Sequence, residues 1–107
     1  MTNEEYKLLL LSLGMTQREA TTEIHGLSPN TFSVYTWTTG QGNIPPKQAQ
    51  RILDYRRKVL EEADRRRKII QSKSTEYTTE QTFWELDLNN PFERAVNIAL
   101  VDEWGIE

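Results

Sequence analysis

The sequence predicts a mainly α-helical chain, with four helices in its first 72 residues followed by a short strand and a last helix. Three observations predict this class. Apolar residues recur at helical spacing over most of the chain, and capping residues and glycines separate these stretches. A single five-residue segment alternates between apolar and acidic side chains as a strand does. We therefore expect a helical domain over residues 1–72 and a short acidic segment over residues 73–107.

The first two helices are expected on either side of Gly14, over residues 3–13 and 16–24. Glycine commonly ends a helix because it adopts the left-handed conformation easily. Thr16 and Glu19 have the spacing of a capping box, which marks the start of the second helix. The residues that share the inward face of the first helix are Tyr6, Leu9, Leu10 and Leu13, and those of the second are Ala20 and Ile24.

A third helix is predicted to start at Ser28-Pro29 and to end before Gly40. Serine is a good N-cap and proline is favoured at the first helical position. In the preferred register, the buried side chains are those of Leu27, Phe32 and Tyr35. An alternative register places Trp37 in the core, which moves the buried face by two residues. The sequence leaves this choice open.

A long fourth helix is predicted from Pro46 to about Ser72. Acidic residues precede basic ones by four positions, which is the favourable order for helical pairs, at Asp54/Lys58, Glu61/Arg65, Glu62/Arg66 and Asp64/Lys68. The basic run over residues 65–68 follows three of these acids, and consecutive residues point around a helix. We interpret this run as a solvated face rather than a second nucleic-acid patch.

The end of the chain is expected to form a dimerisation element. A polar linker over residues 72–82 precedes a strand over 84–88 and a helix over 92–104. A lone strand needs a partner, and no second strong strand occurs in this sequence, which suggests pairing across a homodimer. The residues expected at the dimer interface are Trp84, Leu86, Leu88, Phe92, Val96 and Trp104.

Charge is distributed unevenly along the chain. Residues 1–75 contain 12 Lys/Arg and 8 Asp/Glu, while residues 76–107 contain 1 and 8, so net charges of +4 and −7 make up the total of −3. A basic front suits a polyanionic partner, and the acidic end suits a different task. The longest apolar run, over residues 8–11, is far too short for a membrane span, so we expect a cytoplasmic protein with no membrane partner.

Enzymatic function is not expected from the residue content. The chain has no cysteine and a single histidine, His25, which lies in a predicted turn, where a turn or phosphate-contact role is expected. No catalytic Ser-His-Asp or Cys-His set is available, and no glycine-rich phosphate loop follows a strand. The sequence therefore predicts no enzyme, no cofactor and no metal site.

Motifs between residues 13 and 45 follow one another in a recognisable order. They are Leu13-Gly14-Met15-Thr16-Gln17, Glu19-Ala20, the stretch from Gly26 to Tyr35, Gly40, and Ile44-Pro45. Over residues 4–60 the chain thus resembles the helix-turn-helix of the lambda-repressor/Cro (Xre) class of regulators. Its layout is also similar to the small phage repressors called anti-CRISPR-associated (Aca) proteins. It departs from the class in a turn longer by one residue and in a longer exit from the third helix.

This resemblance implies a sequence-specific transcriptional repressor that binds double-stranded DNA as a homodimer on an inverted repeat, and that controls its own operon. Asparagine can pair with adenine, valine can touch a thymine methyl, and exposed cations can bind phosphates. The candidate DNA-binding residues are Gln17, Arg18, Ser28, Asn30, Thr31, Ser33, Val34, Gln41 and Lys47.

Two other functions remain open at the level of sequence. The helix-turn-helix could serve a protein partner, as in an antitoxin or anti-repressor, with the acidic end as the docking segment. RNA binding would use the same basic surface, but the aromatic residues that single-strand readers expose are not expected on it.

Overall fold

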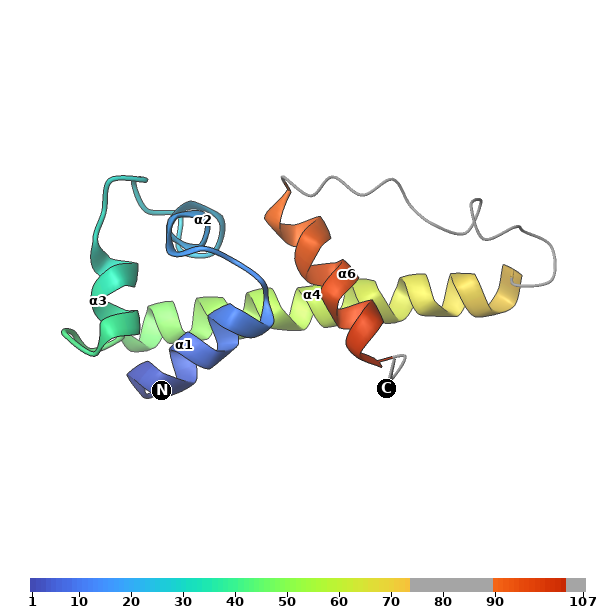
Figure 1. Ribbon diagram of the computed structural model, residues 1–107, viewed down its shortest axis with the longest axis horizontal. Helices are drawn as coiled ribbons and strands as arrows, with labels where there is room; N and C mark the ends of the chain where they lie inside the picture. Colours follow the sequence, from blue (N-terminus) through green and yellow to red (C-terminus); the bar gives the residue numbers. More distant parts are fainter. Residues whose placement is uncertain (74–89, 104–107) are drawn as a thin grey trace.

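A computed structural model of the chain describes residues 1–73 and 90–103, and these residues form five helices and no strand (Figure 1). The predicted mainly α class is confirmed. The strand predicted over residues 84–88 lies outside the described residues. The helices are α1 (Asn3–Ser12), α2 (Gln17–Glu23), α3 (Ser33–Thr39), α4 (Pro46–Lys73) and α6 (Pro91–Glu103).

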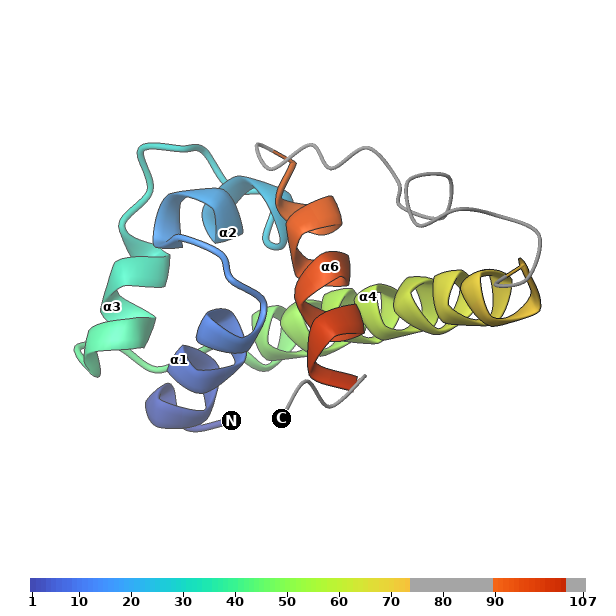
Figure 2. The ribbon, with the colours of Figure 1, turned by 45° about the vertical axis from the view of Figure 1, so that its right-hand side comes forward.

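The long helix α4 is the element on which the others pack. It has 28 residues, which corresponds to about 42 Å at 1.5 Å per residue. Helices α1, α2 and α3 gather at its N-terminal end, and α6 crosses it further along (Figures 1 and 2). Its predicted start at Pro46 is confirmed. Within the described residues, no helix is both long and apolar enough to cross a membrane.

The buried face predicted for α1 is confirmed. Tyr6, Leu10 and Leu13 are buried, and Leu9 packs against the same core. The predicted inward residues of α2, Ala20 and Ile24, are also buried. These side chains form one core with residues of the other helices, namely Met15, Val34, Trp37, Ile52, Val59, Ala63, Ala95 and Val96.

The connection between α1 and α2 forms as the sequence predicts. Gly14 has a φ of +64°, a left-handed conformation that suits glycine and ends α1. The Thr16 hydroxyl accepts a hydrogen bond from the Glu19 backbone N–H at 3.1 Å, and the Glu19 carboxylate accepts one from the Thr16 backbone N–H at 3.0 Å. This reciprocal pair is the predicted capping box. It fixes the orientation of the first turn of α2.

The predicted start of the third helix is wrong, as is its preferred register. Helix α3 begins at Ser33 with Phe32 as its N-cap, not at Pro29 with Ser28 as its N-cap. Its buried residues are Val34 and Trp37, which are 1% and 6% exposed, whereas Phe32 is 78% exposed and Tyr35 is 46% exposed. The alternative register, with Trp37 in the core, is the one that forms. The large indole fills the space between α1 and the end of α2, where two smaller aromatic rings meet it.

His25 lies in a turn, as predicted, but its side chain belongs to the core rather than to the surface. It is 1% exposed, with its Nε2 2.8 Å from the Tyr6 hydroxyl and its Nδ1 2.8 Å from the Gln48 side-chain oxygen. Arg51 donates to its backbone carbonyl at 2.6 Å. Burial lowers the pKa of His25, so the neutral ring is favoured. This network joins α1, α4 and the turn after α2. The buried His25 ring therefore links these elements and does not make the phosphate contact that the sequence suggested.

Helix α6 is part of the same folded unit as α4. Asn90 caps its N-terminus, because the Asn90 Oδ1 accepts hydrogen bonds from the backbone N–H groups of Phe92 and Glu93. The Phe92 ring packs edge-on against Tyr55 at 5.9 Å between ring centres, and Val96 is fully buried. Phe92 and Val96 therefore contact the core of their own chain, which removes Val96 from the predicted dimer interface. Trp84, Leu86, Leu88 and Trp104 lie outside the described residues.

Arg66 corrects the interpretation of the basic run on α4 as a solvated face. Its side chain is 9% exposed and donates two hydrogen bonds to the Glu93 carboxylate of α6, both at 2.8 Å. It also donates to Glu62 at 2.7 Å. Its neighbour Arg65 is 58% exposed and binds the same Glu62. The basic run thus contains one buried cation that holds α6 on α4.

Candidate nucleic-acid interface

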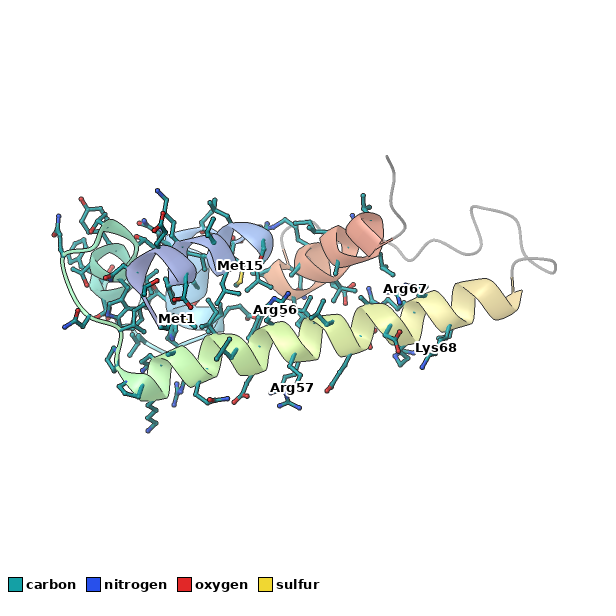
Figure 3. The ribbon with its side chains drawn as sticks, turned by 90° about the horizontal axis from the view of Figure 1, so that it is seen from below. Met1, Met15, Arg56, Arg57, Arg67 and Lys68 are labelled. Atoms are coloured by element: carbon teal, nitrogen blue, oxygen red, sulfur yellow. The ribbon has the colours of Figure 1, made fainter. Side chains whose placement is uncertain are left out.

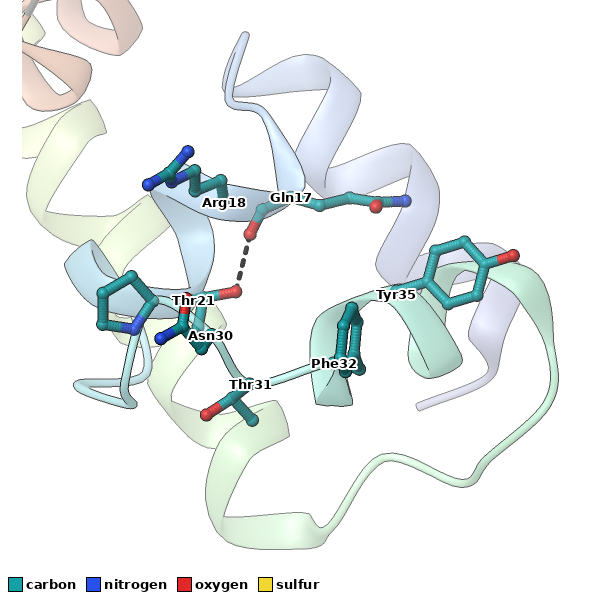
Figure 4. Close-up of a pocket in the computed structure, with 8 residues that line it drawn as sticks. Gln17, Arg18, Thr21, Asn30, Thr31, Phe32 and Tyr35 are labelled. Carbon is teal, nitrogen blue, oxygen red and sulfur yellow. Dashed lines mark hydrogen bonds between the residues drawn. The ribbon is translucent and has the colours of Figure 1, made fainter.

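A surface hollow of about 530 Å³ lies where α2, the following loop and the start of α3 meet (Figure 4). Helix α2 contributes its first residues, the loop contributes a turn, and α3 contributes its N-terminal aromatic residues. The lining residues are Gln17, Arg18, Thr21, Pro29, Asn30, Thr31, Phe32 and Tyr35. Four of the predicted DNA-binding residues, Gln17, Arg18, Asn30 and Thr31, are therefore on one surface.

Gln17 is held in place across this hollow. Its side-chain amide donates to the Thr38 hydroxyl of α3 at 2.8 Å, and its backbone carbonyl accepts from the Thr21 hydroxyl at 2.8 Å (Figure 4). Gln17 and Arg18 are exposed at the start of α2. The glutamine amide is thus oriented by α3 while its helix is oriented by the capping box. Because the Gln17 side chain is already ordered, it loses less conformational entropy when it contacts a ligand.

The loop before α3 presents Asn30 and Thr31 beside the same hollow. The Thr31 backbone N–H donates to the Ser28 carbonyl at 2.9 Å, which closes a turn with Pro29 and Asn30 at its centre. Asn30 is exposed and Thr31 is half-buried. Both side chains carry hydrogen-bonding groups that can meet the donor and acceptor pattern of a base edge.

Two aromatic rings replace the predicted valine at this surface. Val34 is 1% exposed, so it cannot make the predicted contact with a thymine methyl. Phe32 and Tyr35, which the sequence placed in the core, project from α3 along the hollow (Figure 4). The register with Trp37 three residues before Gly40 would have revealed them, since it turns both rings outward.

The remaining candidate residues lie outside the hollow. Ser28 is exposed in the loop, and Ser33 is half-buried, with its backbone carbonyl accepting from the Thr36 hydroxyl at 2.7 Å. Gln41 and Lys47 are exposed, but they follow the C-terminus of α3, at the opposite end of that helix from the hollow. These two side chains can reach only a more distant part of an extended ligand.

The electrostatics around the hollow favour an anion. Arg18 is the charged residue in its lining, and no carboxylate lines it among the described residues. The acids of α2 have partners on other elements. Glu19 forms an ion pair with Arg94 of α6, whose hydrogen bond lowers the Glu19 pKa, and Glu23 accepts from the Tyr55 hydroxyl at 3.2 Å. Attraction to a polyanion is therefore not offset within the site.

The described part of the chain contains no group of three or more His, Asp or Glu residues arranged to hold a metal ion. The arrangement at the hollow instead combines amide, hydroxyl, guanidinium and aromatic groups on an exposed surface. These groups can bind a ligand through hydrogen bonds, charge and apolar contact. In comparisons with known proteins, no family model, curated protein or solved structure matches this chain.

Proposed function

We propose that this protein is a cytoplasmic, sequence-specific repressor that binds double-stranded DNA as a homodimer. The observation that carries the proposal is the convergence of Gln17, Arg18, Asn30 and Thr31 on one surface hollow, which no carboxylate of the described residues lines. Amides and hydroxyls can hydrogen-bond base edges, and the guanidinium can bind phosphate or guanine. A helix-turn-helix presents such groups to the major groove from the start of its second helix. Here that helix is α3, and Asn30 and Thr31 directly precede it, while Gln17 and Arg18 lie at the start of the first helix, α2.

Repression in this proposal is by occlusion. Two copies related by a two-fold axis would place their sites about 34 Å apart, one DNA turn, on an inverted repeat. The net charge of −7 over residues 76–107 keeps that end of each subunit away from the phosphates. A dimer bound over the promoter of its own operon would block polymerase, as the resemblance to phage-type repressors implies.

An exposed apolar face of α1 and α4 supports the homodimer. Leu8, Leu11 and Leu53 are 61%, 65% and 44% exposed. Leu8 and Leu53, but not Leu11, line a hollow of about 590 Å³, whose lining also includes Met1 and Arg56, labelled in Figure 3. We infer that a second copy of the chain occupies this hollow. Its lining contains an acidic residue, Glu5, as well as the basic Arg56, so two copies can offer each other opposite charges.

Glu5 and Arg56 both line this hollow, and in a two-fold dimer a contact between Glu5 of one subunit and Arg56 of the other occurs twice. Both side chains are exposed, and neither forms an ion pair within the described residues. The face therefore offers apolar area together with two reciprocal charge pairs, which favours self-association over docking of an unrelated apolar segment.

Replacing Leu8 with glutamine is expected to raise the dissociation constant of the dimer at least tenfold. Each buried leucine contributes about 1.5–3 kcal/mol, and the two-fold axis counts it twice. Sedimentation velocity over a concentration series measures the effect. Lys7→Gln, on another face of the same helix, is the control and should dimerise as the original chain does. Equal dimerisation of L8Q would place the interface elsewhere, and a monomer at every concentration would contradict the homodimer.

The proposed function is tested by titrating the protein with DNA from upstream of its own gene. Random DNA of the same length is the control, and fluorescence anisotropy is recorded at two salt concentrations. Tight binding to the upstream DNA with much weaker binding to random DNA supports a specific repressor. Weak binding to both that disappears with salt contradicts it, because only the charge attraction would then remain. That outcome would favour a protein partner instead.

Replacing Asn30 with alanine is expected to weaken operator binding by about 1–3 kcal/mol and to leave random-DNA binding nearly unchanged. Asn30 is exposed on the site and can make a bidentate contact with adenine. Lys47→Ala is the matched control, because a lysine that contacts phosphate should weaken binding to both DNAs and lower the salt slope by about one. Equal losses on operator and random DNA for Asn30→Ala would exclude its base-reading role.

A further inference from the structure

Phe32 occupies a position that protein stability does not explain. It is 78% exposed, the highest exposed fraction given for a large apolar residue in the described chain. It is also the N-cap residue of α3, and its side chain makes no capping hydrogen bond. Serine, threonine, asparagine and aspartate are favoured there because their side chains satisfy a free N–H of the first turn. Phenylalanine at this position thus loses a cap and leaves a ring in solvent.

Tyr35 extends the same apolar surface. It follows Phe32 by three residues, a spacing that places both side chains on one side of a helix, and it is 46% exposed. Both rings line the hollow, with the polar groups of Gln17 and Asn30 on its other sides (Figure 4). The site therefore presents a narrow apolar strip beside hydrogen-bonding groups, with Arg18 as its cation.

We propose that Phe32 is a specificity-determining residue that recognises thymine through the C5-methyl group, with Tyr35 packing alongside. This inference rests on the proposed binding of double-stranded DNA. In the major groove, thymine alone among the four unmodified bases presents an apolar group, and phenylalanine is among the residues that contact it. The polar edges of neighbouring bases are matched by Gln17, Asn30 and Thr31.

The groups beside Phe32 suit the edge of a base pair. Asn30 and Thr31 line the hollow together with the ring, and their amide and hydroxyl groups can meet polar base edges. An asparagine suited to adenine next to a ring suited to thymine predicts adjacent A·T base pairs in each half-site.

The test replaces thymine with deoxyuridine, which removes only the methyl group, at one position of the operator at a time. Anisotropy titrations with the full chain are expected to show about fourfold weaker binding at one or two positions per half-site, the effect of losing one buried methyl. Phe32→Ala should bind the thymine operator more weakly and should no longer distinguish thymine from uracil at those positions. Phe32→Leu should retain part of the discrimination.

Two controls separate this inference from the proposed function and from misfolding. Lys7→Gln, at an exposed position of α1 outside the hollow, should discriminate as the original chain does. Phe32→Ala should melt at nearly the original temperature, since the ring is 78% exposed. If uracil is tolerated at every position while operator binding stays tight, the inference fails and the proposed function stands.

Two further results decide the remaining possibilities. If Phe32→Ala still discriminates thymine from uracil, the methyl contact belongs to another residue and the inference fails. If the original chain shows no preference for any upstream DNA, the proposed function fails, and the thymine contact fails with it.

Discussion

Replacing Trp37 with alanine is expected to lower the free energy of unfolding by about 3–5 kcal/mol, the usual cost of deleting a large core aromatic. The indole is 6% exposed and meets the rings of Tyr6 and His25 edge-on, with centres 5.8 Å and 5.0 Å apart. The backbone carbonyl of Trp37 also accepts a hydrogen bond from Asn3 at 2.9 Å, which joins α3 to α1. Alanine would leave a cavity between three helices.

Tyr35→Ala is the matched control, because Tyr35 lies two residues earlier on the same helix and is 46% exposed. We expect it to cost less than about 1 kcal/mol, as surface substitutions usually do. Urea denaturation followed by far-ultraviolet circular dichroism measures both variants. Trp37→Phe, with a smaller loss, serves if the alanine variant does not fold. A larger loss for Tyr35→Ala than for Trp37→Ala would restore the register that the sequence favoured.

The elements that the sequence predicted correctly are those specified by neighbouring residues. The capping box at Thr16 and the glycine stop at Gly14 involve partners within four residues. The buried face of α1 follows from helical periodicity alone. Such signals can be interpreted without knowledge of the rest of the fold, which explains why the mainly α class was predictable.

The start of α3 was mispredicted because Ser28-Pro29 suits two structures. Serine and proline begin helices, but proline is also favoured at the second position of a type I turn, with serine common before it. The hydrogen bond from Thr31 N–H to the Ser28 carbonyl, at 2.9 Å, shows that the turn forms. The helix then starts four residues later than the sequence suggests, and its faces shift with it. Only the tertiary packing of Trp37 decides between the two.

Residues of the candidate site were predicted correctly where the helix or loop that carries them was predicted correctly. Gln17 and Arg18 follow a correctly predicted cap. Asn30 is exposed and Thr31 is half-buried in the loop before α3, and both line the hollow although the helix starts later than predicted. Val34, predicted on the surface, is buried, and Phe32, predicted in the core, is exposed. Both errors follow from the register of α3, because the register decides which residues of a seven-residue helix face the core.

The burial of His25 and Arg66 could not be predicted from neighbouring residues in the sequence. The ring partners of His25, Tyr6 and Gln48, lie 19 and 23 residues away, and Arg66 meets Glu93 across 27 residues. A histidine after a helix and an arginine in a basic run are both ordinary surface patterns. They become buried only because distant helices cover them.

Arg66→Ala is expected to destabilise the protein by about 2–3 kcal/mol, below the 3–5 kcal/mol for a fully buried ion pair because the partners are partly exposed. The Glu93 side chain is 26% exposed and receives both Arg66 hydrogen bonds at 2.8 Å. Removing the guanidinium leaves two carboxylates, Glu62 and Glu93, near each other without the cation between them. Urea denaturation at pH 7 measures the loss.

Arg65→Ala is the control that separates burial from charge. Arg65 also donates to Glu62, at 2.6 Å, but it is 58% exposed, so we expect a loss below about 1 kcal/mol. The hydrogen bonds from Arg66 lower the pKa of Glu93, so the pair stabilises the fold above the unfolded pKa of 4.5. Protonation removes this contribution as the pH falls below that value, and the difference between Arg66→Ala and the original chain should shrink there. Equal losses for the two arginines, independent of pH, would mean that α6 is held on α4 by its apolar contacts alone.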